Sequence, residues 1–339
     1  MRALQVTAPW GIDRVEVVER ADPAPGPGEV LVRMRAVSLN YRDLAMIRHG
    51  VARGVIEEPL TPFSDGCGIV EAVGEGVTRF QVGDRVASMF FQGWIDGRPT
   101  PERTGMTALG WPVPGVGREL AVYSQEGLSK PPEFLTDEEV ACLPCAALTA
   151  WRALFEDARL EPGDSVVVQG TGGVSIFGLQ FAKAAGYRAI VTSSSDEKLE
   201  RARAMGADHL INYRREPEWA RPVREATGGR GADFIMEVGG QGTIQQSMRA
   251  VRLNGHIAII GVLAQGQGEP FNPSSLIGNS ARLQGVSVGS RAMFEAMCRA
   301  IDLHKIRPVV DKRFPFTEAQ AALRAMEAGE HFGKIVLTF

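Results

Sequence analysis

The chain has 339 residues, of which 44% are hydrophobic and 23% are charged, and its formal net charge is −3 at pH 7. These values exclude a disordered or fibrous chain, and the length suggests two domains that can each bury a core. Because there is no basic surplus, no signal-like segment and no membrane-spanning run, we expect a cytoplasmic protein with no nucleic-acid partner and no membrane partner.

The first part of the chain, to about residue 146, has the pattern of a twisted and mostly antiparallel β domain. Turns rich in proline and glycine separate predicted strands at residues 15–19, 29–38, 68–73 and 85–89. Residues 90–118 form a long loop that contains Trp94 and Trp111. A loop of this length often lines a pocket.

A C-x-x-C pair, Cys142 and Cys145, follows this domain. Such pairs occur in redox sites and in halves of zinc sites. No second pair or neighbouring histidine completes a metal cage, and the pair leads into an apolar helix rather than following a strand. We favour buried packing thiols, with a redox pair as the alternative.

Residues 166–175 read VVVQGTGGVS, an apolar β-branched run that ends in glycines and leads into a helical pattern. The pattern predicts a strand, a tight turn and a helix that ends near Gly186. Glycines are needed where a pyrophosphate approaches the backbone at a helix N-terminus. Ser175 replaces the third glycine of the G-x-G-x-x-G pattern, but the context favours a dinucleotide site. The residues assigned to this turn are Gly170, Thr171, Gly172, Gly173 and Val174.

Strands and helices then alternate to about residue 289. Strands are predicted at residues 189–192, 209–213, 232–238, 256–262 and 282–288, and helices at 196–205, 218–227 and 243–251. The alternation favours a doubly wound parallel sheet that binds ligands at the carboxyl ends of its strands. Gly239, Gly240 and Gly261 lie at such ends, where the backbone can approach a cofactor.

The remaining segment predicts a helix at residues 292–304, a strand near 308–311, a further helix and a last strand at 333–339. Thr317 and Gln320 have the spacing of a capping box at the start of the further helix. The last strand has no obvious place in the nucleotide sheet, so we expect it to return to the first domain.

Several motifs follow one another along the whole chain: residues 36–43, 68–74, 82–86, 143–151, the glycine turn and 333–337. Together they resemble the medium-chain dehydrogenase/reductase superfamily, and within it the zinc-independent branch that is similar to quinone oxidoreductases. The resemblance implies an α/β fold. A GroES-like β domain, residues 1–146 and 290–339, would be interrupted by a Rossmann domain, residues 147–289.

Zinc members of this family bind a catalytic zinc through a cysteine, a histidine and a second cysteine. The matching positions here are Asn40, Ser64 and Cys145, with Asp65 in place of a neighbouring glutamate. An amide, a hydroxyl and one thiolate are a poor ligand set for Zn²⁺. The loop at 90–118 also lacks the cysteines of a structural zinc, so we expect no metal. Cys145 would be a packing thiol or, alternatively, would touch the substrate.

The cofactor preference is predicted from the end of the second strand of the nucleotide domain. NAD-binding units carry an acidic residue there, about 20 residues past the first glycine, whereas this chain has three serines. We therefore expect NADPH, and NADH remains an alternative because Asp196 follows. Lys198 could equally be a solvated residue of a helix that Ser195 caps. The cofactor positions that these arguments and the resemblance imply are Thr149, Ser193, Ser194, Lys198, Tyr213, Gly239, Gly261 and Lys334.

Hydride addition to a conjugated alkene or a quinone gives a delocalised anion that a few hydrogen-bond donors can stabilise without a metal. We therefore expect a small-molecule substrate of this kind. Asn40 is our first choice as the oxyanion donor and Tyr41 a candidate proton donor, and the other polar candidates are Arg42, Asp43 and Ser64. A zinc-free alcohol dehydrogenase or carbonyl reductase is one alternative. An NADPH-binding structural or RNA-binding protein is another, although the acidic net charge argues against RNA.

The last strand of the nucleotide sheet, residues 282–288, predicts how the chain assembles. An exposed edge strand is normally covered or paired, and in relatives it pairs with the same strand of a second copy. We therefore expect a homodimer.

Overall fold

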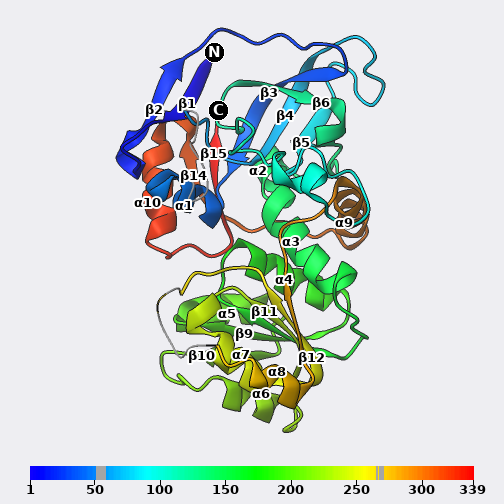
Figure 1. The fold of residues 1–339 in the computed structure, drawn as a ribbon, viewed down its shortest axis with the longest axis vertical. Coiled ribbons are helices and arrows are strands. Elements are labelled where there is room, and N and C mark those ends of the chain that lie inside the picture. The colour runs from blue at the N-terminus through cyan, green and yellow to red at the C-terminus, as the bar shows by residue number, and fades with distance from the viewer. Residues whose placement is uncertain (51–58, 265, 267–270) are drawn as a thin grey trace. The chain divides into compact units, whose positions relative to one another are not determined.

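The computed structural model describes residues 1–50, 59–264, 266 and 271–339 (Figure 1). Contacts between Cα atoms divide the chain into two units, residues 1–148 with 288–339 and residues 149–287. Within the described ranges, every helix is too short or too polar to span a lipid bilayer.

The first unit is built on a mixed sheet with the strand order β14-β15-β3-β4-β5-β7, and β6 also pairs with β3. These strands are β3 (Glu29–Ser38), β4 (Asp65–Val73), β5 (Arg85–Ser88), β6 (Leu120–Ser124), β7 (Leu128–Ser129), β14 (Val310–Pro315) and β15 (Lys334–Thr338). A separate antiparallel ribbon joins β1 (Arg2–Val6) to β2 (Val15–Glu19). Strand β15 pairs antiparallel with β3, which confirms that the last strand returns to this unit.

The core of this unit lies against β3, whose buried side chains include Val30, Val32, Met34 and Val37. Burial of each such side chain stabilises the fold by about 1.5–3 kcal/mol. The helices are α1 (Tyr41–His49), α2 (Asp137–Ala141), α9 (Arg291–His304) and α10 (Ala319–Glu327), and α1 lies beside α10 (Figure 1).

The predicted capping box before α10 is wrong. Glu318, not Thr317, stands at the N-cap, and its side chain makes no capping hydrogen bond. Phe316 is buried in the preceding 3-10 turn (Phe316–Glu318) and stacks on Phe339 with ring centroids 4.4 Å apart. Burial of this aromatic ring draws the turn inward and moves the helix start past Thr317.

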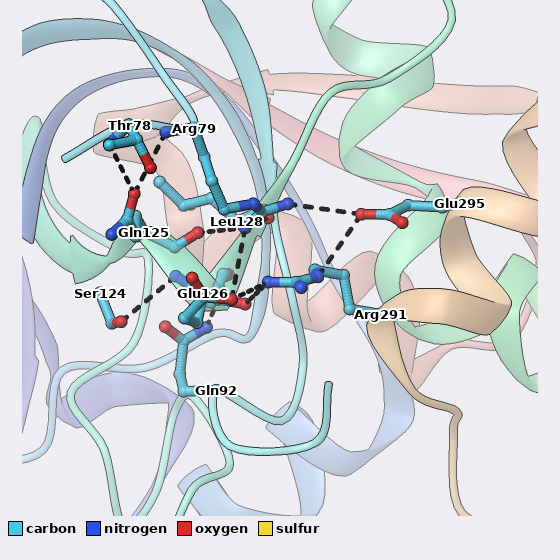
Figure 2. Close-up of polar contacts among 10 residues, drawn as sticks. Thr78, Arg79, Gln92, Ser124, Gln125, Glu126, Leu128, Arg291 and Glu295 are labelled. Carbon is cyan, nitrogen blue, oxygen red and sulfur yellow. Dashed lines mark hydrogen bonds and ion pairs between the residues drawn. The ribbon is translucent and has the colours of Figure 1, made fainter. Parts of the chain in front are cut away.

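Two arginines and two glutamates hold α9 against the loop that precedes β7 (Figure 2). Arg291 Nη1 donates to the Glu126 carboxylate at 2.5 Å, and Arg79 Nη2 lies 3.4 Å from Glu295 Oε1. Arg79 also donates to the carbonyl oxygen of Leu128 at 3.1 Å. The network therefore anchors the first turn of α9 within the first unit.

The second unit is a parallel sheet with the strand order β10-β9-β8-β11-β12-β13. Its strands are β8 (Ser165–Gln169), β9 (Arg188–Ser193), β10 (His209–Asn212), β11 (Ala232–Glu237), β12 (Val251–Ile259) and β13 (Arg282–Gly285). Its helices are α4 (Gly173–Ala184), α5 (Asp196–Ala204), α6 (Ala220–Ala226), α7 (Ile244–Ala250) and α8 (Ser274–Asn279). Short helical segments precede β8: π-helical turns at Leu143–Ala147 and Arg152–Glu156 flank α3 (Leu148–Trp151). The order confirms the predicted doubly wound α/β fold, with the switch point between β8 and β11.

The last two predicted strands of this sheet differ from those observed. Strand β12 begins at Val251 instead of residue 256, through an irregular pairing with β11 that Asn254 accommodates with a φ of 57°. Strand β13 ends at Gly285 instead of residue 288. Because Val288 has a φ of 48°, the extended run cannot continue to it.

Candidate functional site

The glycine turn between β8 and α4 lies at the switch point of the parallel sheet. Gly170 has a φ of 72°, which favours glycine. Gly172 is the N-cap of α4, and a Cβ placed on it would have nothing within 4 Å. Open space above a helix N-terminus leaves its N–H groups accessible to a phosphate. The predicted strand, turn and helix are all present.

Ser175 and Gly178 together allow α4 to pack closely on the strands, which the third glycine does in the consensus pattern. The hydroxyl of Ser175 donates to the carbonyl oxygen of Gln169 at 2.7 Å, which ties the helix to the strand. A Cβ on Gly178 would lie 2.4 Å from the sulfur of Met236, so this glycine permits close packing of α4 on β11. The sequence pattern did not single out Gly178.

The end of β9 carries the three serines. Ser193 is buried, and Ser195 caps α5 by accepting a hydrogen bond from the Lys198 N–H at 3.3 Å. Lys198 is half-buried in the first turn of this helix, and Tyr213 follows β10 with a side chain that is 41% exposed. The helix start thus groups hydroxyl donors with one lysine.

Asp196, the carboxylate that kept NADH as an alternative, accepts hydrogen bonds from two side chains. Its Oδ1 atom accepts from Asn212 Nδ2 at 2.7 Å and from Arg215 Nη2 at 2.5 Å. One oxygen of the carboxylate is therefore engaged within its own unit, and a second cation, Arg215, lies beside this end of the strand.

The remaining cofactor candidates of the second unit are Gly239, Gly261 and Thr149, and each is packed within the fold. Gly239 donates its N–H to the Glu237 carboxylate at 2.8 Å. A Cβ on Gly261 would lie 2.6 Å from the carbonyl oxygen of Val238, so the close approach of the segments after β11 and β12 favours glycine here. Thr149 is buried, with 3% of its surface exposed.

In the first unit, a chain of buried polar groups joins Lys334 to Asp65. Lys334 Nζ donates to the carbonyl oxygen of Leu39 and to Asn40 Oδ1, both at 2.6 Å. Asn40 Nδ2 donates to Ser64 Oγ at 3.4 Å. The Ser64 hydroxyl donates in turn to Asp65 Oδ1 at 2.7 Å. Lys334, which the sequence assigned to the cofactor, here contacts the catalytic candidate Asn40.

The carboxyl groups of this cluster have unusual proton affinities. Burial raises the pKa of Asp43 to about 7 against the opposing charge of Arg42, and Asp43 Oδ2 accepts the N–H of Asn40 at 2.8 Å. Burial also raises the pKa of Asp65, which Lys334 opposes. The second oxygen of Asp65 accepts the Cys145 N–H at 2.9 Å. Burial raises the pKa of the Cys145 thiol as well, so the sulfur favours its protonated form.

Arg42 and Tyr41 differ from the other catalytic candidates. Arg42 donates to the carbonyl oxygens of Leu109 at 3.0 Å and Trp111 at 2.8 Å, and its guanidinium lies 4.9 Å from the ring centroid of Phe90. It therefore positions the long loop. Tyr41 is half-exposed, whereas Asn40, Asp43 and Ser64 are buried together.

Aromatic side chains at the start of the long loop, residues 90–118, pack largely on one another. The ring centroids of Phe90 and Phe91 lie 4.7 Å apart, those of Phe91 and Trp94 lie 5.9 Å apart, and all three side chains are buried. Across the described ranges, no group of three or more histidine, cysteine, aspartate or glutamate side chains is arranged to hold a metal ion.

Comparison with known proteins places both units among dehydrogenases. A family model for an alcohol dehydrogenase GroES-like domain matches residues 26–133, and one for a zinc-binding dehydrogenase matches residues 173–302. The chain is 44% identical over 334 residues to a zinc-type alcohol dehydrogenase-like protein of Schizosaccharomyces pombe, with 96% of each chain covered. It is 31% identical to a 2-haloacrylate reductase of a Burkholderia species, with 93% of this chain and 92% of the relative covered.

Two solved structures resemble the whole chain. An NAD-dependent alcohol dehydrogenase superposes with a TM-score of 0.90 at 34% identity, with all of both chains covered. The mycobacterial protein Rv1454c, crystallised with NADPH, superposes with a TM-score of 0.82 at 28% identity, again with all of both chains covered.

Proposed function

Because the chain belongs to the medium-chain dehydrogenase/reductase superfamily, we propose that it is a zinc-independent enzyme that transfers hydride from NADPH to an activated C=C bond or a quinone. Membership of this family makes it an oxidoreductase. The proposal adds the cofactor, the substrate class and the absence of a metal requirement. Cytoplasmic location and a small-molecule substrate are part of the same proposal.

The observation that carries the proposal is the contact between Lys334 and Asn40. The ammonium group donates to the amide oxygen at 2.6 Å, so the oxygen and nitrogen of this amide cannot exchange places without losing that bond. The Nδ2 side, with its N–H groups, is then the side that serves as donor. A fixed donor of this kind stabilises the enolate formed when hydride adds to the β-carbon of a conjugated carbonyl compound.

The side chains at the zinc-ligand positions of the family do not fit a zinc ion here. The oxygen of Asn40 accepts from an ammonium group, whose positive charge would repel Zn²⁺. The Ser64 hydroxyl donates to Asp65, and a hydroxyl and an amide beside a single cysteine are a poor ligand set for zinc. No step of the proposed reaction therefore uses a metal ion.

The preference for NADPH rests on the end of β9. One oxygen of Asp196 accepts from Asn212 and Arg215, and Lys198 and the serines lie at the helix start that a 2′-phosphate would approach. The mycobacterial neighbour crystallised with NADPH supports this choice. The NAD-dependent neighbour makes NADH the competing cofactor to be measured.

The substrate class is supported by the chemistry of the 2-haloacrylate reductase relative, whose substrate name denotes a conjugated alkene. The alcohol dehydrogenase neighbour supports carbonyl reduction as the second candidate. Oxidation of NADPH and NADH is measured with a matched panel of enones, quinones and aldehydes. We expect enones or quinones to be turned over with NADPH, whereas turnover of aldehydes alone would favour the second candidate. Cofactor binding without turnover of any class would favour a structural protein.

A further inference from the structure

Gln169 and Glu237 end the two strands that flank the switch point of the parallel sheet. They are the last residues of β8 and β11, whose register pairs Val168 with Met236 one position earlier. Both side chains are buried, and Glu237 has no exposed surface. Two glycine-containing turns start directly after them, at residues 170–173 and 238–240.

The two oxygens of the Glu237 carboxylate accept hydrogen bonds from different parts of the fold. One oxygen accepts the N–H groups of Gly239 at 2.8 Å and Gly240 at 3.0 Å, and also the hydroxyl of Thr243. The other oxygen accepts Gln169 Nε2 at 2.8 Å and the hydroxyl of Ser247. A single side chain thus holds the turn after β11 and reaches across to β8.

The amide of Gln169 has only one orientation that satisfies its neighbours. Its Oε1 atom accepts the backbone N–H of Val238 at 3.2 Å, and its Nε2 atom donates to Glu237 and to Ser247 Oγ at 2.8 Å. Because the backbone N–H can only donate, rotation of the amide would place Gln169 Nε2 opposite the Val238 N–H, and two donors would face each other. The pair therefore forms a polar bridge with a fixed sense, from the strand before one turn to the strand before the other.

We propose that Gln169 and Glu237 are positioning residues that set the two glycine turns at the spacing needed to bind the dinucleotide. The inference rests on the proposed function, because it needs a bound dinucleotide, which the sequence places at both glycine turns. Neither side chain needs to contact the cofactor. Their effect is exerted through the position of the turn at 238–240, whose N–H groups Glu237 holds, and through the strand end that leads into the turn at 170–173.

The fixed orientation makes a reciprocal exchange of the two residues a sharp test. In Glu237→Gln, the new amide nitrogen must face either Gln169 Nε2 or the N–H groups of Gly239 and Gly240, so donors oppose donors. In the double variant Gln169→Glu with Glu237→Gln, the carboxylate accepts from Val238 and from the new amide. The oxygen of that amide still accepts from Gly239 and Gly240, so each of these donors faces an acceptor.

A matched control exists at the opposite ends of the same two strands. There the Asp233 carboxylate accepts the Ser165 N–H at 2.8 Å and its hydroxyl at 2.7 Å, which also joins β8 to β11. Asp233 also pairs with Arg230 at 2.7 Å and with Arg252 at 2.5 Å. Asp233→Asn therefore weakens a buried carboxylate that joins the same two strands at the ends remote from the turns. It should lower the melting temperature and leave cofactor binding unchanged.

The experiment measures the Kd of NADPH by fluorescence titration of the wild type, the single variants and the double variant, together with the KM for NADPH, kcat and the melting temperature. We expect Glu237→Gln to weaken NADPH binding about 10-fold to 100-fold, with kcat at saturating cofactor nearly unchanged, and the double variant to restore most of the affinity. If Glu237→Gln does not fold, Ser247→Ala, which removes one donor from the same carboxylate, should weaken binding in the same direction.

Several results would overturn the inference. An unchanged Kd in a folded Glu237→Gln or Ser247→Ala variant would show that the bridge has only a structural role. A folded double variant that binds NADPH no better than Glu237→Gln would exclude the hydrogen-bond complementarity. An equal loss of affinity in Asp233→Asn would show that general destabilisation, and not this bridge, weakens binding. A wild-type protein that binds neither NADPH nor NADH would overturn the proposed function, and this inference with it.

Discussion

Replacing Lys334 by methionine removes an ammonium group that donates two hydrogen bonds of 2.6 Å while only 3% of the residue is exposed. Hydrogen bonds from charged groups contribute about 1.5–3 kcal/mol each, so the fold should lose several kcal/mol of stability. The amide of Asn40 would also lose the contact that fixes its orientation. A misplaced oxyanion donor typically lowers kcat by about 10²–10³.

The assay compares kcat and the KM for NADPH in wild type, Lys334→Met and Lys305→Met. Lys305 is an exposed lysine that pairs with Asp302 at 2.7 Å, so its replacement should change neither value. We expect Lys334→Met to lower kcat and to leave the KM for NADPH within about twofold, a range smaller than the effect of losing one hydrogen bond. A higher KM for NADPH with unchanged kcat would instead return Lys334 to the cofactor site and refute the role assigned to Asn40.

Three further predictions follow from the described contacts. Lys198→Ala should raise the KM for NADPH about 10-fold or more and leave that for NADH nearly unchanged, because only NADPH carries the 2′-phosphate; an equal effect on both would exclude this contact. The pKa of Asp43 is about 7 in the fold against 3.8 in the unfolded chain, and the charged groups that act on it in the fold are Arg42, Asp65 and Lys334. Its contribution to stability is therefore complete below pH 4 and lost as the pH rises towards 7. Asp43→Asn should flatten that part of the pH dependence of urea unfolding midpoints, and an unchanged slope would refute the raised pKa. Light scattering at micromolar concentration should give the mass of a dimer, since β13 is the edge strand of its sheet; a monomer would contradict this.

The fold was predictable where a local pattern determines the backbone. The apolar run before Gly170 predicts β8, and the glycine predicts the turn, in which Gly170 has a φ of 72°. Strand β3 was predicted at its observed bounds because apolar residues alternate with arginines from Val32 to Ala36, and burial follows this alternation. Element ends that tertiary contacts decide were not predictable, as the burial of Phe316 before α10 shows.

The candidate site was predictable in its members but not in their connections. Asn40, Asp43 and Ser64 do lie together, because the end of β3 and the start of β4 are neighbours in the sheet. The contact of Asn40 with Lys334 joins residues 294 positions apart, and no local signal in the sequence predicts such a pairing. The bridge between Gln169 and Glu237 was missed for the same reason, since each residue alone looks like an ordinary strand end.

The central claim, reduction of an activated alkene or quinone by NADPH without a metal, is tested most directly by turnover of metal-free protein. The protein is dialysed against EDTA, its zinc content is measured by elemental analysis, and NADPH oxidation is followed with an enone, a quinone and an aldehyde. Turnover of the enone or the quinone should be undiminished with far less than one zinc per chain, and mass spectrometry should detect the saturated ketone or the hydroquinone. Activity that disappears with EDTA and returns with stoichiometric zinc would contradict the account.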